Sequence, residues 1–216
     1  MDVKAHADAD TTFFVDSGAT LTLANTLQLD NTTIFKEGEG ILYVDAATTG
    51  NGTFEVTGGT LAGDGTVGGD LTASAGFVAP GHGVGRLDVQ GDFALAAEAT
   101  LQIDLAGPSS TDLLVVSGEA ELGGSLEVVL GDGYQPELGS QFLVMIAGGV
   151  TDNGLTLSGP YADQFSMTAL GSTLVLESLF AGLAGDYSGD GTVDAADYNI
   201  WRDSLGQRQI ASGSGK

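Results

Sequence analysis

The sequence predicts an all-β protein, a parallel β-solenoid in which short strands stack coil upon coil, followed by a small C-terminal loop and helix. Three observations lead to this fold class. Glycine accounts for 35 of the 216 residues, about twice its usual share of ~7%, while hydrophobic residues still make up 42%. Apolar and polar residues alternate in short segments, and glycines recur at a regular interval. The chain therefore has the composition of many short strands joined by tight turns around a substantial core.

Six segments share one pattern, because each opens at glycine or alanine and then alternates apolar with polar residues. This period of two is typical of a strand with one buried face. The segments are GATLTL (18–23), GILYV (40–44), GTFEV (52–56), ATLQIDL (99–105), GSLEVVL (124–130) and GSTLVLES (171–178). No sustained helical spacing of apolar residues occurs before residue 195, so we expect helix to be nearly absent from the body of the chain.

The strand segments recur at an interval that matches one solenoid coil. Gly18, Gly38 and Gly58 lie 20 residues apart, each beside or within the start of a strand. Coils of about this length stack in parallel and bury a shared interior. A β-sandwich is the alternative, since its turns also recur every ~8–12 residues.

Residues 50–105 carry the most specific pattern. GTLAGDGTVGGDL is followed by a turn at Pro80 and Gly81, then by GRLDVQGDF and ATLQIDL. This order resembles the autotransporter-associated β-strand repeat, also called the passenger-associated transport repeat, and residues 112–130 and 134–149 resemble regions that commonly follow it. The resemblance covers roughly residues 11–180 and implies a right-handed β-helix exposed on, or secreted from, a bacterial cell.

The turn APGHGVGRL (79–87) carries two polar side chains, His82 and Arg86. Proline fixes its own φ and the glycines permit positive φ, so the chain can leave one strand here and enter another. His82 and Arg86 could contact a small anion or a sugar. We expect instead that both are solvated loop side chains, because neither has an evident partner.

The stretch DYSGDGTVDAAD (186–197) has the ligand spacing of a twelve-residue EF-hand calcium loop. Oxygen ligands at positions 1, 3, 5, 7, 9 and 12 would be Asp186, Ser188, Asp190, the carbonyl of Thr192, Asp194 and Asp197. Gly191, at position 6, allows the sharp turn. Because calcium prefers six to eight oxygen ligands, the sequence predicts calcium as a cofactor here. An acidic turn that binds no metal is the alternative.

The loop departs from the usual EF-hand pattern at positions 3 and 12, where serine and aspartate replace the common Asp or Asn and Glu. With AADYNIWRDSLG behind it, the stretch resembles one half of a type I dockerin, which implies a cohesin-like partner. Tyr198, Trp201 and Leu205 form an apolar stripe on the expected helix. Residues 207–216 contain no second calcium loop. Either the chain stops between two halves, or the stripe docks onto the solenoid end or another molecule.

These patterns divide the chain into four parts: an N-terminal arm (1–10), a β-solenoid with a trailing β region (11–180), a dockerin-like calcium loop and helix (181–206) and a flexible tail (207–216). GPSST (107–111) separates the repeat from the trailing region. AGLAG (181–185) is a short linker of small residues.

Charge and composition exclude several classes of partner. The chain has 29 acidic and 6 basic residues, a formal net charge of -23, and such a surface repels nucleic acid and anionic lipid. No apolar run is long enough to span a membrane, so we expect neither nucleic-acid binding nor membrane insertion. The chain has no cysteine, which excludes disulfides and thiolate chemistry. MDVKAHADAD lacks the regions of a signal peptide, so export would require a signal that has been removed.

An enzyme is not expected. Polysaccharide lyases on β-helices usually use lysine or arginine beside calcium, and hydrolases use clustered carboxylates. Lys36 and Arg86 are the basic residues of the solenoid region and lie far apart in sequence. The acids Asp64, Asp70, Asp88, Asp92 and Asp104 are scattered among strand ends, where solvated turn residues are the ordinary explanation.

A structural protein needs the fewest additional assumptions. Open solenoid ends present strand edges that can stack on a neighbouring molecule, and such head-to-tail contacts can run into filaments. We expect a secreted bacterial surface or extracellular matrix protein with calcium at its C-terminal loop, whose partners are further copies or a cohesin-like protein. The alternative is a dockerin-tagged adhesion or carbohydrate-binding module; aromatic residues, at 7%, are few for a polysaccharide-binding face.

Overall fold

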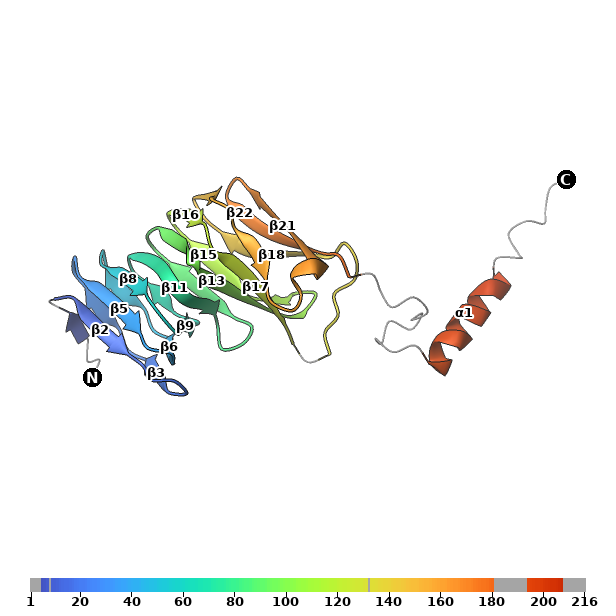
Figure 1. Cartoon of the computed structure of the whole chain (residues 1–216), viewed down its shortest axis with the longest axis horizontal. Coiled ribbons are helices and arrows are strands. Elements are labelled where there is room, and N and C mark those ends of the chain that lie inside the picture. The colour runs from blue at the N-terminus through green and yellow to red at the C-terminus, as the bar shows by residue number, and fades with distance from the viewer. Residues whose placement is uncertain (1–4, 8, 132, 181–193, 208–216) are drawn as a thin grey trace.

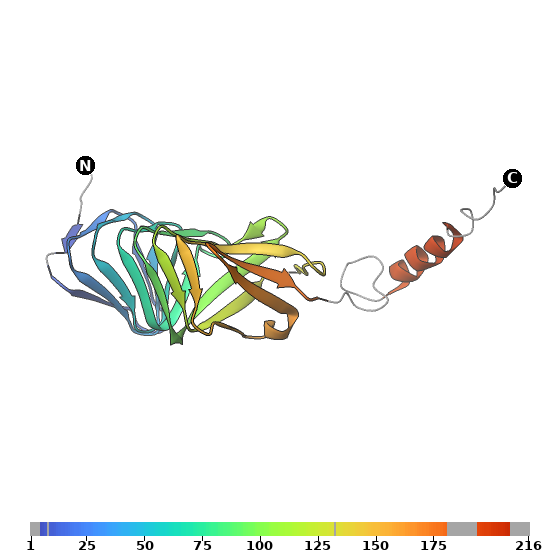
Figure 2. The same cartoon turned by 90° about the horizontal axis from the view of Figure 1, so that it is seen from above.

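The computed structural model describes residues 5–7, 9–131, 133–180 and 194–207. Strands stack along the long axis of the body from the N-terminal end toward residue 180, as Figure 1 shows, and Figure 2 gives the same coils from above. Pairing between successive coils is parallel from β1 to β20, except for the short strand β14. This arrangement confirms the predicted parallel β-solenoid over the β-sandwich.

The chain passes over three faces in turn. The first face consists of β2 (Thr11–Phe14), β5 (Thr33–Glu37), β8 (Thr53–Val56), β16 (Glu119–Leu122), β19 (Gly149–Asp152) and the N-terminal halves of β11 (Asp70–Pro80) and β13 (Phe93–Gly107). The second face consists of β3 (Thr20–Leu23), β6 (Ile41–Val44), β9 (Thr60–Gly63), β17 (Ser125–Leu130), β20 (Thr156–Ser158) and the C-terminal halves of β11 and β13. These two faces form one sheet because β11 and β13 continue through the corner between them, where β11 shifts register between Ala73 and Ala75.

The third face closes the coil. It consists of β1 (Ala5–Ala7), β4 (Leu27–Leu29), β7 (Thr48–Gly50), β10 (Thr66–Val67), β12 (Arg86–Val89), β15 (Leu113–Val116), β18 (Gln141–Ile146), β21 (Phe165–Leu170) and β22 (Thr173–Ser178). Outside the faces lie β14 (Ser110–Thr111), the 3-10 turn Ala162–Gln164 and α1 (Ala195–Gln207). Because β1 pairs with β4, the first coil begins within the stretch expected to be an N-terminal arm.

In-register stacking arranges the inward side chains in continuous rows. On the second face, one row runs through Leu21, Leu42, Leu61, Val78, Leu101, Leu126 and Leu157. On the first face, another runs through Ile34, Phe54, Leu71, Phe93 and Ala120, all of them buried. The alternation read in the sequence therefore produces the core, because every second residue of each strand points into it.

The coil length is not constant at the predicted interval of 20 residues. Paired residues of the first face are 20 apart at Thr33 and Thr53, 17 apart at Thr53 and Asp70, and 30 apart at Ala120 and Val150. The interior fixes the strands, whereas the turns between faces can lengthen outward at little entropic cost.

The C-terminal end of the third face departs from parallel stacking. β22 pairs antiparallel with β18 and with β21. Two carbonyls in the turn between β21 and β22 accept hydrogen bonds from the preceding coil, Gly171 from the amide of Val150 and Ser172 from the amide of Ala147, both at 2.8 Å. A hairpin therefore covers part of the solenoid end that was expected to be open.

The core contains a lysine side chain. Lys36 occupies the inward row between Phe13 and Val56 and is fully buried. Its Nζ donates to the carbonyls of Glu37, Gly38 and Gly58 at 3.0, 2.8 and 2.9 Å. Burial lowers the pKa of Lys36, and the charge of Glu39 opposes that shift. Lys36 thus joins the turns of two coils and does not reach the outer surface.

Candidate functional site

The acidic residues of the turns hydrogen-bond the main chain of the next coil. Asp70 Oδ1 accepts from the amide of Asp92 at 2.9 Å, and Asp92 Oδ1 accepts from the amide of Glu119 at 2.8 Å. Asp64 Oδ1 accepts from the amide of Arg86 at 3.0 Å. These acids were expected to be solvated turn residues; they are exposed, but each carboxylate links two coils.

Glycine occupies positions that lie directly against these carboxylates, where a side chain would not fit. A Cβ atom at Gly91 would overlap the Asp70 carboxylate, and one at Gly118 would overlap that of Asp92. The recurring Gly-Asp pair, as in Gly91 and Asp92, is the sequence signal for these contacts. The same corner of the coil holds Asp10, whose Oδ1 accepts from the amide of Thr33 at 2.7 Å.

The loop between β11 and β12 places its two polar side chains against partners. His82 Nε2 lies 2.7 Å from Asp45 Oδ1, and the His82 ring stacks on Tyr43 with centroids 3.9 Å apart. Arg86 donates from Nε and one terminal nitrogen to Asp88, and this bond raises the pKa of Arg86. The expectation that both lack partners was wrong: stacking of the coils brings Asp45 to His82, and Arg86 pairs with Asp88 two residues further along its own strand.

Asp112, which was not among the predicted site residues, has a strongly raised pKa. Its side chain is buried, Oδ1 accepts from the amide of Gly85 at 2.7 Å, and Oδ2 accepts from the amide of Asp104 at 2.8 Å. Burial raises the pKa of Asp112 to about 7; the two amides oppose this shift, and the charges of Asp104 and Asp64 add to it. Asp112 follows the GPSST break directly, which is the only sequence signal for it.

We expect Asp112 to make the protein less stable as the pH rises from about 4 to about 7. The folded pKa lies above the ordinary value, so the folded protein retains a proton that the unfolded chain has lost. Stability from this proton is fully present below the pKa of the unfolded chain and is lost as the pH rises from there to the folded pKa, at up to about 1.4 kcal/mol per pH unit. Urea unfolding across this range should show a shallower pH dependence for Asp112→Asn. An identical pH dependence in both proteins would contradict the assignment.

A shallow pocket of about 150 Å³ lies on the outside of the second face beside this loop. Its lining residues are Ile41, Tyr43, Thr60, Ala62, Ala79, Pro80, Gly81, Gly83, Gln102 and Asp104. Burial raises the pKa of Asp104, and its Oδ1 is buried without a hydrogen-bond partner. Most of the lining is small or apolar. With His82 bound to Asp45, the described residues around this pocket do not include a nucleophile paired with a base.

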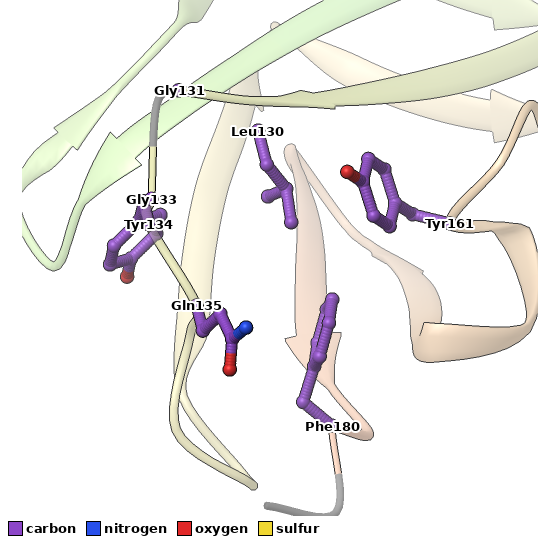
Figure 3. A pocket seen from close by; sticks show the side chains of 7 residues that line it. All are labelled: Leu130, Gly131, Gly133, Tyr134, Gln135, Tyr161 and Phe180. Carbon is purple, nitrogen blue, oxygen red and sulfur yellow. The ribbon is translucent and has the colours of Figure 1, made fainter. Parts of the chain in front are cut away.

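A larger pocket of about 310 Å³ lies at the C-terminal end of the solenoid. It is lined by Leu130, Gly131, Gly133, Tyr134, Gln135, Tyr161 and Phe180. Figure 3 shows Leu130, Tyr161 and Phe180 turned toward one another, with Gln135 opposite Phe180. Ring centroids of Tyr161 and Phe180 are 6.2 Å apart, and Phe165 packs edge-on against Phe180 at 5.5 Å. This pocket could not be predicted from the sequence, because its aromatic residues come from three separate segments.

The predicted calcium ligands lie largely outside the described residues. Asp186, Ser188, Asp190 and Thr192 fall there, and no side-chain position is described for Asp197. Asp194 precedes α1, and its Oδ1 accepts from the amide of Ala196 at 2.7 Å, as a helix-capping residue does. The residues behind the predicted loop form α1, whereas the loop and its calcium binding stay predictions.

No protein-family model matches the chain. A protein named extracellular serine protease from Serratia marcescens is 32% identical over 117 residues, which cover 52% of this chain and 11% of that protein. The adhesin BmaC autotransporter of Brucella suis biovar 1 (strain 1330) is 30% identical over 202 residues, covering 83% of this chain and 6% of that protein. The chain thus spans about a tenth or less of these relatives. Together with the parallel solenoid, the similarities fit an autotransporter-type repeat.

Within the described residues, no helix has the length and apolar character needed to cross a membrane.

Proposed function

We propose that this chain is a non-enzymatic structural segment of a secreted or surface-exposed bacterial protein. Its relatives are named as an extracellular protease and an autotransporter adhesin, which supports a location outside the cell. The segment would act as a stiff spacer, because each coil stacks on the last through strand pairing and a continuous apolar interior.

The proposal rests on the hydrogen bonds that the acidic side chains of the turns accept. Asp64, Asp70 and Asp92 accept main-chain hydrogen bonds from a neighbouring coil, and Lys36 donates to three carbonyls within the core. The acidic and basic side chains that a lyase or hydrolase would need for catalysis thus hydrogen-bond the main chain and hold the coils together. A structural role explains their positions without a substrate.

Asp92→Ala tests this use of the acids. We expect it to lower the free energy of unfolding by about 1–2 kcal/mol, because the amide of Glu119 loses its acceptor. Glu98→Ala, at another exposed acid of the same region, is the matched control and should change stability by less than about 0.5 kcal/mol. Equal stability of the two variants in urea unfolding would argue against a structural role for the turn acids.

We also propose that residues 186–197 bind calcium and form a C-terminal docking motif for a cohesin-like protein. The spacing of oxygen-bearing residues supports this proposal, as does the helix that follows, with Asp194 at its start. Asp197→Ala is expected to abolish calcium binding in calorimetry and to leave the melting of the β body unchanged, whereas Asp203→Ala should retain calcium binding. Unchanged calcium affinity of Asp197→Ala would rule out the loop assignment.

Self-association is the second candidate. In the first coil, at the N-terminal end of the solenoid, Phe14 and Leu21 are exposed. Exposed apolar side chains are expected on a surface that contacts another molecule. The hairpin at the other end opposes simple strand-to-strand stacking there. Negative-stain electron microscopy in calcium and in excess chelator distinguishes the two: filaments would establish self-association, and dispersed particles in both conditions would favour a separate partner.

A further inference from the structure

We propose that the pocket on the outside of the second face binds a lysine side chain of a partner polypeptide, with Asp104 accepting hydrogen bonds from its ammonium group. This pocket is the one of about 150 Å³ beside the loop between β11 and β12. The proposal goes beyond the proposed function, since neither the stacking of the coils nor calcium binding requires the pocket.

In-register stacking explains why the second face is hollowed at this place. Tyr43 pairs with Ala62, and Ala62 pairs with Ala79, so these three side chains form one row on the outside of the face. Gln102 continues the row in the next coil. Two alanines therefore separate two larger side chains. Because neighbouring strands lie about 4.8 Å apart, the strands of Tyr43 and Gln102 are about 14 Å apart.

The loop between β11 and β12 closes one side of this gap. Gly81 and Gly83 line the pocket, and both have positive φ, 87° and 93°. His82, between them, fastens the loop, because its ring stacks on Tyr43 and its Nε2 lies 2.7 Å from Asp45 Oδ1. The result is a small slot with alanines at its base, which suits an unbranched alkyl chain such as that of lysine.

Asp104 brings a carboxyl group without a cationic partner to this slot. Its Oδ1 is buried and has no hydrogen-bond partner. Its Oδ2 faces Gly83, where an added Cβ atom would lie 3.9 Å from it. The basic side chains of the loop, His82 and Arg86, pair with other acids, and no described residue forms a salt bridge with Asp104. An ammonium group would supply the missing partner through a charge-assisted hydrogen bond.

The surroundings of Asp104 favour a cation over a neutral ligand. Burial raises the pKa of Asp104, and the side chain of Gln102 opposes that shift. Burial is also the main cause of the raised pKa of Asp112, to which the charges of Asp104 and Asp64 add. Three carboxyl groups are therefore within electrostatic reach of one another. The formal net charge of -23 attracts cations to the molecule as a whole.

The face around the slot favours a polypeptide as the carrier of the ammonium group. The outward side chains of β6, β9 and the C-terminal half of β11 carry no charge; they are Ile41, Tyr43, Thr60, Ala62, Phe77 and Ala79. On the first face, the same coils present Glu37, Glu55 and Asp70 outward. A polypeptide can thus lie on the neutral second face while one lysine enters the slot, whereas a free polyamine is attracted to acids over the rest of the surface.

Titration of the full chain with Nα-acetyl-lysine N-methylamide, followed by amide NMR, tests the proposal. We expect saturable shifts at Gly81, Gly83 and their neighbours. Asp104→Asn keeps the shape of the side chain but removes its charge, so it should weaken binding at least about tenfold. Glu98→Gln, the same change at an exposed acid elsewhere, should leave the affinity unchanged. Equal affinity of Asp104→Asn and the unaltered chain would overturn the proposal.

Filling the slot gives a second test that leaves the acids in place. Ala79 points outward, so Ala79→Leu occupies the space between Tyr43 and Gln102 without altering the core. This variant should abolish binding of the lysine derivative. Ala94→Leu, the same change on the outside of the first face, should bind like the unaltered chain. Unchanged affinity of Ala79→Leu would show that the ligand does not enter the slot.

Other ligands identify the chemistry that the pocket recognises. The uncharged norleucine derivative, glucose, calcium and putrescine, a free diamine, should each bind at this pocket at least about tenfold more weakly than the lysine derivative. Tighter binding of putrescine would assign the pocket to free polyamines, and tighter binding of glucose would assign it to a carbohydrate. Shifts that spread over the acidic surface without saturation would indicate non-specific attraction. Each of these results would overturn the proposal.

Discussion

Gly50→Ala is expected to lower the free energy of unfolding by about 2 kcal/mol more than Gly154→Ala does. Of these two glycines, Gly50 lies directly against a neighbouring coil and Gly154 does not. The two glycines have nearly the same φ, 105° and 106°, so both variants place a side chain at the same disfavoured φ. A Cβ atom at Gly50 would overlap the carbonyl oxygen of Leu29, whereas at Gly154 it meets nothing within 4 Å.

Urea unfolding followed by circular dichroism measures this difference. Gly154→Ala should show only the strain of the disfavoured conformation, about 1–3 kcal/mol. Equal losses in both variants would mean that the coils at Leu29 and Gly50 are not packed as closely as described.

Lys36→Met should also be strongly destabilising. Methionine keeps much of the apolar length of the side chain but donates no hydrogen bond, so the carbonyls of Gly38 and Gly58 lose their contacts with Nζ. A buried acceptor without a partner costs about 1–3 kcal/mol, and we expect a total loss of about 2 kcal/mol or more.

Arg86→Met is the matched control for the lysine variant. Arg86 pairs with Asp88 at the surface, where its side chain is 57% exposed, and such pairs contribute about 0–1 kcal/mol. If Lys36→Met proved as stable as Arg86→Met, Lys36 would not be needed to join the turns of its two coils.

The repeating part of the fold could be predicted from the sequence because its determinants are local. Alternation in segments such as GILYV and GTFEV sets which residues point inward, and the recurrence of such segments at about one coil length predicts parallel stacking. Gly18 and Gly38, two of the glycines whose interval indicated the coil length, adopt positive φ, as does Gly59 beside the third.

The remaining features depend on contacts between distant residues. In the sequence, Lys36 occupies a polar position of a predicted strand. Its burial depends on carbonyls of two different turns. Asp112 resembles any turn aspartate until Gly85 and Asp104 are brought against it. The antiparallel β21–β22 hairpin and the aromatic pocket beside Phe180 likewise form only when separate segments meet. No local pattern in a single sequence encodes such pairings.

A calcium titration of the full chain by isothermal calorimetry, with circular dichroism of the same samples in excess chelator, tests most directly whether a preformed structural solenoid carries a separate calcium-binding motif. We predict saturable binding of calcium at a single site and a β-sheet spectrum that chelator leaves unchanged. Absence of calcium binding, or loss of the β-sheet spectrum in chelator, would contradict this division of the chain.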